Sequence, residues 1–199
     1  MIYLMRHGES IVNVERALPC RRLDGDLTEL GREQSLRAAQ WLTDKSITQI
    51  RTSPIHRAMQ TAAIIAEAHG VNLVVDDDLR EADCGDVENM PFDEALTVWR
   101  RIYVRWLLFD AEARFPGGES YVEARERFIR ALGKCPRNES VLLVTHSDIT
   151  HTVIPPSCVN AAALQRVAPL DNTGIVILEH YDTERYICSA WNLVEHLSD

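Results

Sequence analysis

The chain has 199 residues and a formal net charge of −9. This length suits one domain, taken here as residues 1–199, with a sizeable hydrophobic core of its own. An acidic chain repels nucleic acids and anionic membranes, so neither is an expected partner, and an anionic substrate would need a local site of positive charge.

The first part of the chain predicts strands that alternate with helices. Short apolar runs with β-branched residues are typical of buried strands. Thr28 is a good N-cap residue, and Ser53 followed by Pro54 is typical of a helix start. A polar, irregular segment covers residues 8–27. The expected strands are 2–5, 46–52 and 71–75, and the expected helices are 28–44 and 53–69.

The second part continues this alternation after an acidic loop. The run Val141–Val144 is apolar throughout, as in a central parallel strand that is buried on both faces. The helix before it has an apolar stripe that Arg125 interrupts, formed by Val122, Phe128, Ile129 and Leu132. The other expected segments are the loop 76–90, a helix over 91–110, a break at 116–118, and a strand pair, 175–178 and 186–190, that forms a hairpin.

This order of elements predicts a three-layer α/β/α sandwich around a mostly parallel central sheet. In such sheets, ligand sites lie beyond the carboxyl ends of the strands. His7 follows the first strand, Arg57 lies one turn into the helix after the second, and His146 follows the central strand. We therefore expect these side chains, together with Arg6, to converge at one edge of the sheet.

Two histidines and two arginines in one site suit a phosphoryl group. Each guanidinium can donate a fork of hydrogen bonds to phosphate oxygens and stays charged at working pH. A helix that starts near Ser53 would add attraction for an anion. A neutral imidazole can attack phosphorus when its other ring nitrogen is held by an acceptor. For His7, the backbone carbonyl of Gly8 is a candidate acceptor.

A leaving alkoxide needs a proton, and carboxyl groups crowd the loop after the third strand. Clustered like charges can raise the pKa of one carboxyl toward working pH, as a general acid requires. The residues alone leave the choice open among Asp76, Asp77, Asp78, Glu81, Asp83, Asp86 and Glu88.

The sequence resembles the histidine phosphatase superfamily, also called the phosphoglycerate mutase-like family, over most of its length. The most specific element is the stretch Arg6-His7-Gly8-Glu9, with Asn13 four residues on. The Arg6-His7-Gly8 triplet alone would be weak evidence for this family, whereas several motifs in the family's order and at near-normal spacing are strong evidence. The further matching stretches are Leu27–Gly31, Ser53–Ala62, Leu79–Glu88, Pro116–Ser120, Val144–His146 and Asn192–Leu197.

The resemblance implies a phosphoglycerate mutase-like fold and a phosphohistidine intermediate on His7. It also implies that Glu81 is the proton donor, which the residues alone do not decide. The residues implied to bind the transferring phosphoryl group are Arg6, Arg57 and His146, with Asn13 nearby and Ser147 as a backbone N–H donor.

The sequence departs from the family pattern beside two of these residues. In the loop 76–90, called the acid loop below, Cys84 and Val87 replace aromatic residues, and Asn89 replaces a glycine. After the second histidine, Ser147 replaces a glycine and is followed by Asp148. The Asp148 carboxylate either holds His146 protonated or faces away. These changes leave the core chemistry intact and the substrate open.

Structural interpretations compete with some of these assignments. Asn13 could simply form a turn, and Arg57 could pair with a carboxylate on a helix surface, although the complete motifs favour function. The pairs Arg21–Arg22 and Arg100–Arg101 are either ordinary surface charge or contacts to a second anionic group of the substrate.

The expected function is a phosphomonoesterase that acts on a small phosphorylated metabolite. Two alternatives stay open: mutase-type transfer between positions of the substrate, and a non-catalytic module that binds a phosphorylated ligand. The stretch Glu81–Gly85 differs from the mutase pattern and favours the phosphatase. No metal or other cofactor is expected, because His146 and His151 do not share a helix face and the arginines supply positive charge.

The cysteines favour an intracellular setting. The five cysteines are scattered and include no C-x-x-C pair, which favours free thiols in a reducing compartment. Residues 1–5 are apolar, but the run ends at Arg6, far short of a secretory signal. We therefore expect a cytoplasmic protein. Its oligomeric state stays open, a homodimer being one option.

Overall fold

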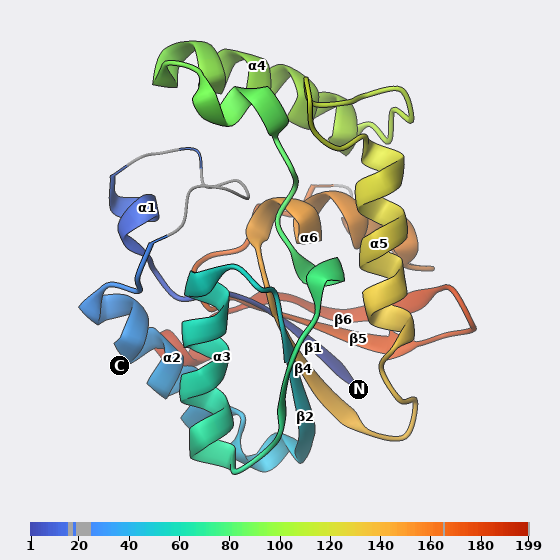
Figure 1. Cartoon of the computed structure of the whole chain (residues 1–199). Helices are drawn as coiled ribbons and strands as arrows, with labels where there is room; N and C mark the ends of the chain where they lie inside the picture. The colour runs from blue at the N-terminus through green and yellow to red at the C-terminus, as the bar shows by residue number, and fades with distance from the viewer. Residues whose placement is uncertain (16–17, 19–24, 165, 199) are drawn as a thin grey trace.

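A computed structural model describes residues 1–15, 18, 25–164 and 166–198. At its centre lies a six-stranded sheet in the order β3-β2-β4-β1-β5-β6 (Figure 1). Neighbours among β1 to β4 run parallel, whereas β5 and β6 are antiparallel, as the sequence predicts. The strands are β1 (Ile2–Arg6), β2 (Ile47–Thr52), β3 (Leu73–Val75), β4 (Ser140–Thr145), β5 (Ile175–His180) and β6 (Tyr186–Leu193).

Helices cover both faces of this sheet, which confirms the three-layer sandwich (Figure 1). On one face lie α2 (Glu29–Trp41) and α3 (His56–His69). On the other lie α5 (Tyr121–Gly133) and α6 (Ser147–Val153), with α4 (Phe92–Leu107) packed beyond them. The short helices are α1 (Ile11–Val14), η1 (Thr43–Lys45), η2 (Asp77–Leu79), η3 (Gly85–Asn89), η4 (Pro155–Ser157), η5 (Ala161–Leu164) and η6 (Glu195–Leu197). Among the described residues, no helix has the length and apolar character needed to cross a membrane.

The central strands feed both cores because side chains of a strand alternate between its two faces. In β1, Ile2 and Leu4 join the core beneath α5 and α6, whereas Tyr3 and Met5 join the core beneath α2 and α3. Strand β4 is divided in the same way, and Val141–Thr145 are all fully buried. Burial on both faces explains why this run is apolar throughout.

Two helix boundaries test the local sequence signals. Helix α2 begins after Thr28, whose Oγ1 accepts the Gly31 N–H at 3.0 Å, as predicted. The predicted start of α3 at Ser53 is wrong, because the helix begins at His56. The Ser53 N–H instead donates to the Val144 carbonyl at 3.0 Å, which extends the sheet by one residue.

The buried face of α5 differs from the predicted stripe. Val122 is 38% exposed and Arg125 is partly exposed, whereas Arg127 is only 4% exposed. The arginine that interrupts the apolar face is therefore Arg127. The buried residues of the helix are Tyr121, Ala124, Arg127, Phe128, Ala131 and Leu132.

The prediction of free thiols is wrong for Cys84, which is disulfide-bonded. Spacing along the chain does not reveal which thiols the fold brings together. Cys135, Cys158 and Cys188 are free and buried, in agreement with the prediction. Cys20 lies outside the described residues.

Candidate active site

The sheet register brings the ends of β1, β2 and β4 together. Arg6 pairs with Thr145, and Thr52 pairs with Val144. The His7 N–H continues this ladder and donates to the Thr145 carbonyl at 3.0 Å. His7, Ser53 and His146 each follow one of these strands, so they lie side by side at the carboxyl edge of the sheet.

His7 is a neutral imidazole held in one orientation. Its Nδ1 lies 2.7 Å from the Gly8 carbonyl oxygen, which can only accept, so Nδ1 carries the ring proton. The lone pair is then on Nε2, which accepts from Arg57 Nε at 3.0 Å. Burial, followed by the guanidinium groups of Arg57 and Arg6, holds the pKa of His7 well below its ordinary value.

The turn after His7 requires Gly8. A Cβ on this residue would lie 2.5 Å from the Gly31 carbonyl oxygen, inside any permitted contact. The Gly8 N–H donates to Thr61 Oγ1 at 3.0 Å, and that hydroxyl donates to the Arg57 carbonyl at 2.9 Å. The His7 turn and the first turns of α3 are therefore connected through Thr61.

Arg57 and His146 complete a buried cluster around His7. The Arg57 side chain is fully buried, and its Nη2 lies 3.4 Å from His146 Nδ1. The other ring nitrogen of His146, Nε2, is 2.8 Å from Ser53 Oγ. The two imidazole centroids are 5.2 Å apart. Burial, Arg57 and His7 lower the pKa of His146 well below its ordinary value, so both rings are neutral.

Arg6 and Ser147 both contact the backbone at Leu170. Arg6 Nη1 donates to the Leu170 carbonyl at 2.6 Å. Ser147 Oγ accepts from the Leu170 N–H at 3.0 Å. Every residue carries the same backbone groups, so the identity of Leu170 gives no sign of these contacts in the sequence. The Ser147 side chain is thus occupied in holding the segment before β5.

Asn13 contacts the His7 region through its neighbours. Its Oδ1 accepts from the Ser10 N–H and hydroxyl, both at 3.0 Å, as a cap of α1. Asn172 Nδ2 lies 3.4 Å from the same oxygen and 3.2 Å from the His7 carbonyl oxygen. Asn13 therefore makes the turn considered as its structural alternative, and it could contact phosphate only through its amide nitrogen.

Glu81 faces the N-terminal turn of α6. Its carboxylate accepts the N–H groups of Ala82 at 2.9 Å, Asp148 at 3.1 Å and Ile149 at 2.8 Å. Burial raises the pKa of Glu81, and these three N–H groups oppose that effect because they stabilise the ionised form. Glu81 thus lies directly beside the turn that carries His146.

The neighbouring acids are engaged elsewhere. Asp76 pairs with Arg51 Nη2 at 2.9 Å and with Lys134 Nζ at 2.7 Å. Asp78 pairs with Lys134 at 2.9 Å and Arg130 at 2.9 Å. These ion pairs lower the pKa of both acids even though desolvation works in the opposite direction. Of these three acids, Glu81 is the one that contacts the first turn of α6, directly after His146.

A buried arginine that the sequence motifs do not predict holds the acid loop. Arg127 donates to both carboxylate oxygens of Glu119, at 2.7 and 2.8 Å. It also donates to the carbonyl oxygens of Asp78, Arg80 and Glu81, at 3.0, 2.8 and 3.0 Å. The available signal was Glu119 of the Pro116–Ser120 motif, since a carboxylate that the fold largely covers requires a partner.

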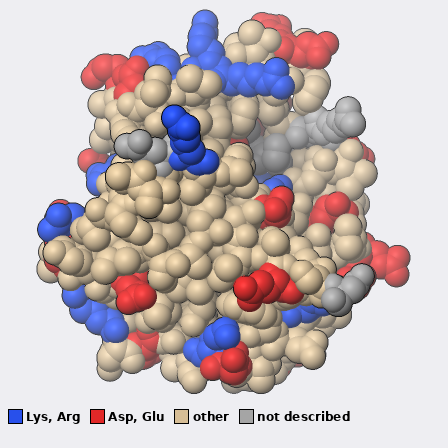
Figure 2. Space-filling view, turned by 180° about the vertical axis from the view of Figure 1, so that it is seen from behind, with Lys and Arg blue, Asp and Glu red and all other residues tan. Residues whose placement is uncertain are grey.

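The basic pair on α4 is exposed and lies apart from this buried cluster. Arg100 and Arg101 are exposed on α4, and Figure 2 shows basic side chains gathered at the end of the molecule where α4 lies. Arg21 and Arg22 lie outside the described residues. Within the described part of the chain, no group of three or more His, Cys, Asp or Glu side chains could hold a metal ion.

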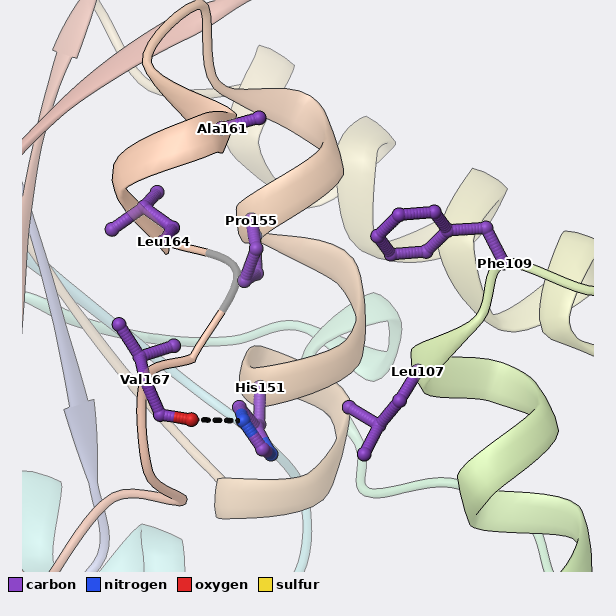
Figure 3. Close-up of a pocket in the computed structure, with 7 residues that line it drawn as sticks. All are labelled: Leu107, Phe109, His151, Pro155, Ala161, Leu164 and Val167. Atoms are coloured by element: carbon purple, nitrogen blue, oxygen red, sulfur yellow. Dashed lines mark hydrogen bonds between the residues drawn. The ribbon is translucent and has the colours of Figure 1, made fainter.

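His151 belongs to a separate apolar cavity of about 190 Å³. Its Nε2 donates to the Val167 carbonyl at 2.8 Å (Figure 3), so Nδ1 accepts the Tyr103 hydroxyl at 2.6 Å. With both nitrogens occupied and burial lowering its pKa, His151 is a structural residue. The cavity is lined by Leu107, Phe109, His151, Pro155, Ala161, Leu164 and Val167.

Comparisons with known proteins identify the family of the chain. A family model for the histidine phosphatase superfamily (branch 1) matches residues 2–194. The chain belongs to this superfamily. The resemblance inferred from the motifs is therefore confirmed, and the histidine phosphatase fold accounts for the sandwich.

Curated relatives and solved structures extend this comparison. "Probable phosphoglycerate mutase GpmB" of Yersinia pestis (strain Pestoides F) is 33% identical over 202 residues, covering 100% of this chain and 92% of that protein. A mycobacterial glucosyl-3-phosphoglycerate phosphatase in complex with VO3 matches with a TM-score of 0.79 at 26% identity, covering 96% of this chain and 98% of that one. YhfR of Bacillus stearothermophilus matches with a TM-score of 0.78 at 27% identity, covering 99% of this chain and 98% of that one.

Proposed function

We propose that this histidine phosphatase hydrolyses the phosphate ester of a small metabolite through a phosphohistidine on His7. The observation that carries the proposal is the bond from His7 Nδ1–H to the Gly8 carbonyl at 2.7 Å, which leaves a lone pair on Nε2. The guanidinium groups of Arg57 and Arg6 lie beside this ring. A neutral nucleophile among fixed cations suits attack on an anionic phosphoryl group.

The first step joins His7 Nε2 to phosphorus while the bond to the leaving oxygen breaks. Glu81 gives its proton to that oxygen, so an alcohol departs. Arg57 then directs its N–H groups to the phosphoryl oxygens. Arg6 can do the same, because its buried Nε has no hydrogen-bond partner among the described residues.

The second step releases phosphate. Water attacks phosphorus, the bond to His7 Nε2 breaks, and Glu81 takes the proton that the water loses. His7 and Glu81 thus return to their starting states. Positioning and charge neutralisation supply most of the rate, so the scheme requires no metal ion.

Related proteins support hydrolysis of a phosphate ester. One neighbour above 25% identity is a glucosyl-3-phosphoglycerate phosphatase whose structure holds VO3. Oxidovanadium anions resemble a phosphoryl group in charge and shape, so the presence of VO3 in that neighbour supports chemistry on a phosphoryl group.

The test is hydrolysis of an aryl phosphate in the presence of a chelator. His7→Ala should abolish phosphate release. The matched control is His69→Ala, at the opposite end of α3 from Arg57, which should retain full activity. Trapping of an acid-labile phosphoenzyme in the native protein and not in His7→Ala would support the intermediate. Full activity of His7→Ala would overturn the mechanism.

The acid assignment has its own comparison. Glu81→Gln should slow hydrolysis by about 10²–10⁴-fold, the usual contribution of a general acid. Glu88→Gln, in the same loop, is the control and should change the rate little. An equal loss in both variants would contradict the assignment to Glu81.

Mutase activity is the second candidate, favoured by the name of the relative that is 33% identical. The dividing question is whether water or a second hydroxyl reaches the phosphohistidine. Conversion of 3-phosphoglycerate to 2-phosphoglycerate, measured with and without a bisphosphate primer, separates the two. Isomerisation without phosphate release would favour the mutase. Phosphate binding without either reaction would favour a non-catalytic module.

A further inference from the structure

Asp148 brings a second carboxyl group to the acid of the site. It follows Ser147 in the first turn of α6, and its own N–H donates to Glu81 Oε2 at 3.1 Å. The Asp148 side chain is half-buried, and among the described residues its carboxyl group makes no hydrogen bond. A carboxyl group in this position has no evident structural partner, so it is available for chemistry.

The hydrogen bonds to Glu81 create a conflict for a general acid. Three backbone N–H groups hold its carboxylate, and such bonds favour the ionised form. An acid that has already lost its proton cannot protonate a leaving oxygen at neutral pH. Burial raises the pKa of Glu81 against the effect of these bonds, and a second carboxyl group close to Glu81 would add to that effect. Asp148 is placed to provide it.

The groups that face Asp148 come from several elements. Arg6 of β1 and Arg57 of α3 are positive and lower its pKa, whereas burial and then the Glu81 carboxylate raise it, to about 8. Tyr103 of α4 faces both acids, which contribute after burial to raising its own pKa. His7 and His146 are neutral. Two neighbouring carboxyl groups that are shielded from solvent resist double ionisation and titrate as a pair.

We propose that Glu81 and Asp148 share one proton at neutral pH, and that Asp148 is a positioning residue that keeps Glu81 able to protonate the leaving oxygen. The inference rests on the proposed function for its catalytic part. During the first step the pair passes its proton to the leaving oxygen, and both carboxyls are then ionised beside Arg6 and Arg57. Water attack on the phosphohistidine returns one proton to the pair.

The direct test is a carboxyl ¹³C NMR titration of the whole protein. One carboxyl of the native pair should retain its proton to near-neutral pH. Asp148→Asn should lower the midpoint of the Glu81 titration by at least about one pH unit, because the neighbouring charge is removed. The control is Asp171→Asn, which removes an exposed carboxylate that faces Arg6. An unchanged Glu81 titration in Asp148→Asn would overturn the proposal.

The pH–rate profile supplies the functional readout. With phenyl phosphate, Asp148→Asn should move the basic limb of kcat/KM downward by about one pH unit or more, and Asp171→Asn should not. The loss at neutral pH should be smaller with 4-nitrophenyl phosphate, whose better leaving group needs less protonation. A basic limb that stays in place would count against the pair.

The two readouts separate the two hypotheses. If the native protein hydrolyses no phosphate ester, the proposed function fails, while the NMR titration still decides whether the carboxyls share a proton. If hydrolysis requires His7 but Asp148→Asn changes neither readout, the carboxyl pair fails and the phosphatase stands.

Discussion

Replacing Arg127 with methionine should both destabilise the fold and disturb the acid loop. The side chain is 4% exposed and donates five hydrogen bonds: two to the Glu119 carboxylate and three to carbonyl oxygens of the loop. Methionine fills a similar volume but donates nothing. The change would remove the nearer cation of the Glu119 side chain, which is only 15% exposed, and leave Arg80 Nη2 at 3.9 Å as its remaining ion-pair partner.

The expected cost is about 3–5 kcal/mol, the usual result of removing one partner of a buried ion pair. For a chain of this size, each 1 kcal/mol lowers Tm by about 2–4 °C, so Tm should fall by about 6–20 °C. Urea unfolding measures the free energy. Because the Glu81 carbonyl loses its donor at the same time, kcat should fall further than the folded fraction explains.

A double-mutant cycle provides the control. Arg127→Met combined with Glu119→Leu removes both charges, so it should recover part of the stability lost in Arg127→Met alone. A loss below about 1 kcal/mol with unchanged kcat would refute the view that this pair holds the acid loop.

Further measurements test the backbone, the core and the buried histidines. Gly85→Ala should lower the free energy of unfolding more than Gly70→Ala does. The φ angle is positive at both residues, but a Cβ at Gly85 would lie 2.3 Å from Gly118 N, whereas a Cβ at Gly70 would meet nothing within 4 Å. Equal losses of unfolding free energy, measured by urea denaturation, would contradict this expectation. Phe128→Ala, at a fully buried position, should cost about 3–5 kcal/mol by the same measurement. Stability should fall as pH drops below 6.5, because the pKa of His7 and of His146 lies below that value in the folded state, so the unfolded state binds more protons. The slope, measured down to about pH 5, should be shallower in His146→Gln, and an identical slope would argue against buried neutral rings.

The convergence of the site could be predicted because it depends on topology alone. Parallel strands bring their carboxyl ends to one edge, and β1 and β4 are neighbours in the sheet. Any residue just after such a strand reaches that edge. This is why His7, Arg57 and His146, far apart in the chain, could be expected in one site from the order of elements.

Other features depend on contacts that the sequence does not encode locally. Ser53 has the side chain of an N-cap, but its N–H pairs with the Val144 carbonyl, so the sheet overrides the local preference. Arg125 and Arg127 are both near the apolar face of α5. Which of them is buried depends on the Glu119 carboxylate and the loop carbonyls, and both come from other segments.

The acid loop shows most clearly the difference between what the local sequence predicts and what contacts from other segments decide. Seen along the chain, Glu81 and Asp78 are equivalent carboxylates in an acidic loop. The fold separates them: Asp78 meets Lys134, whereas Glu81 meets the N–H groups of Asp148 and Ile149 from α6. The contact that supports Glu81 as the proposed acid also brings Asp148 against it. On the proposed mechanism, the packing of α6 against the loop thus places both the acid and its second carboxyl group. A substitution at residue 148 should therefore change how Glu81 titrates without moving its side chain.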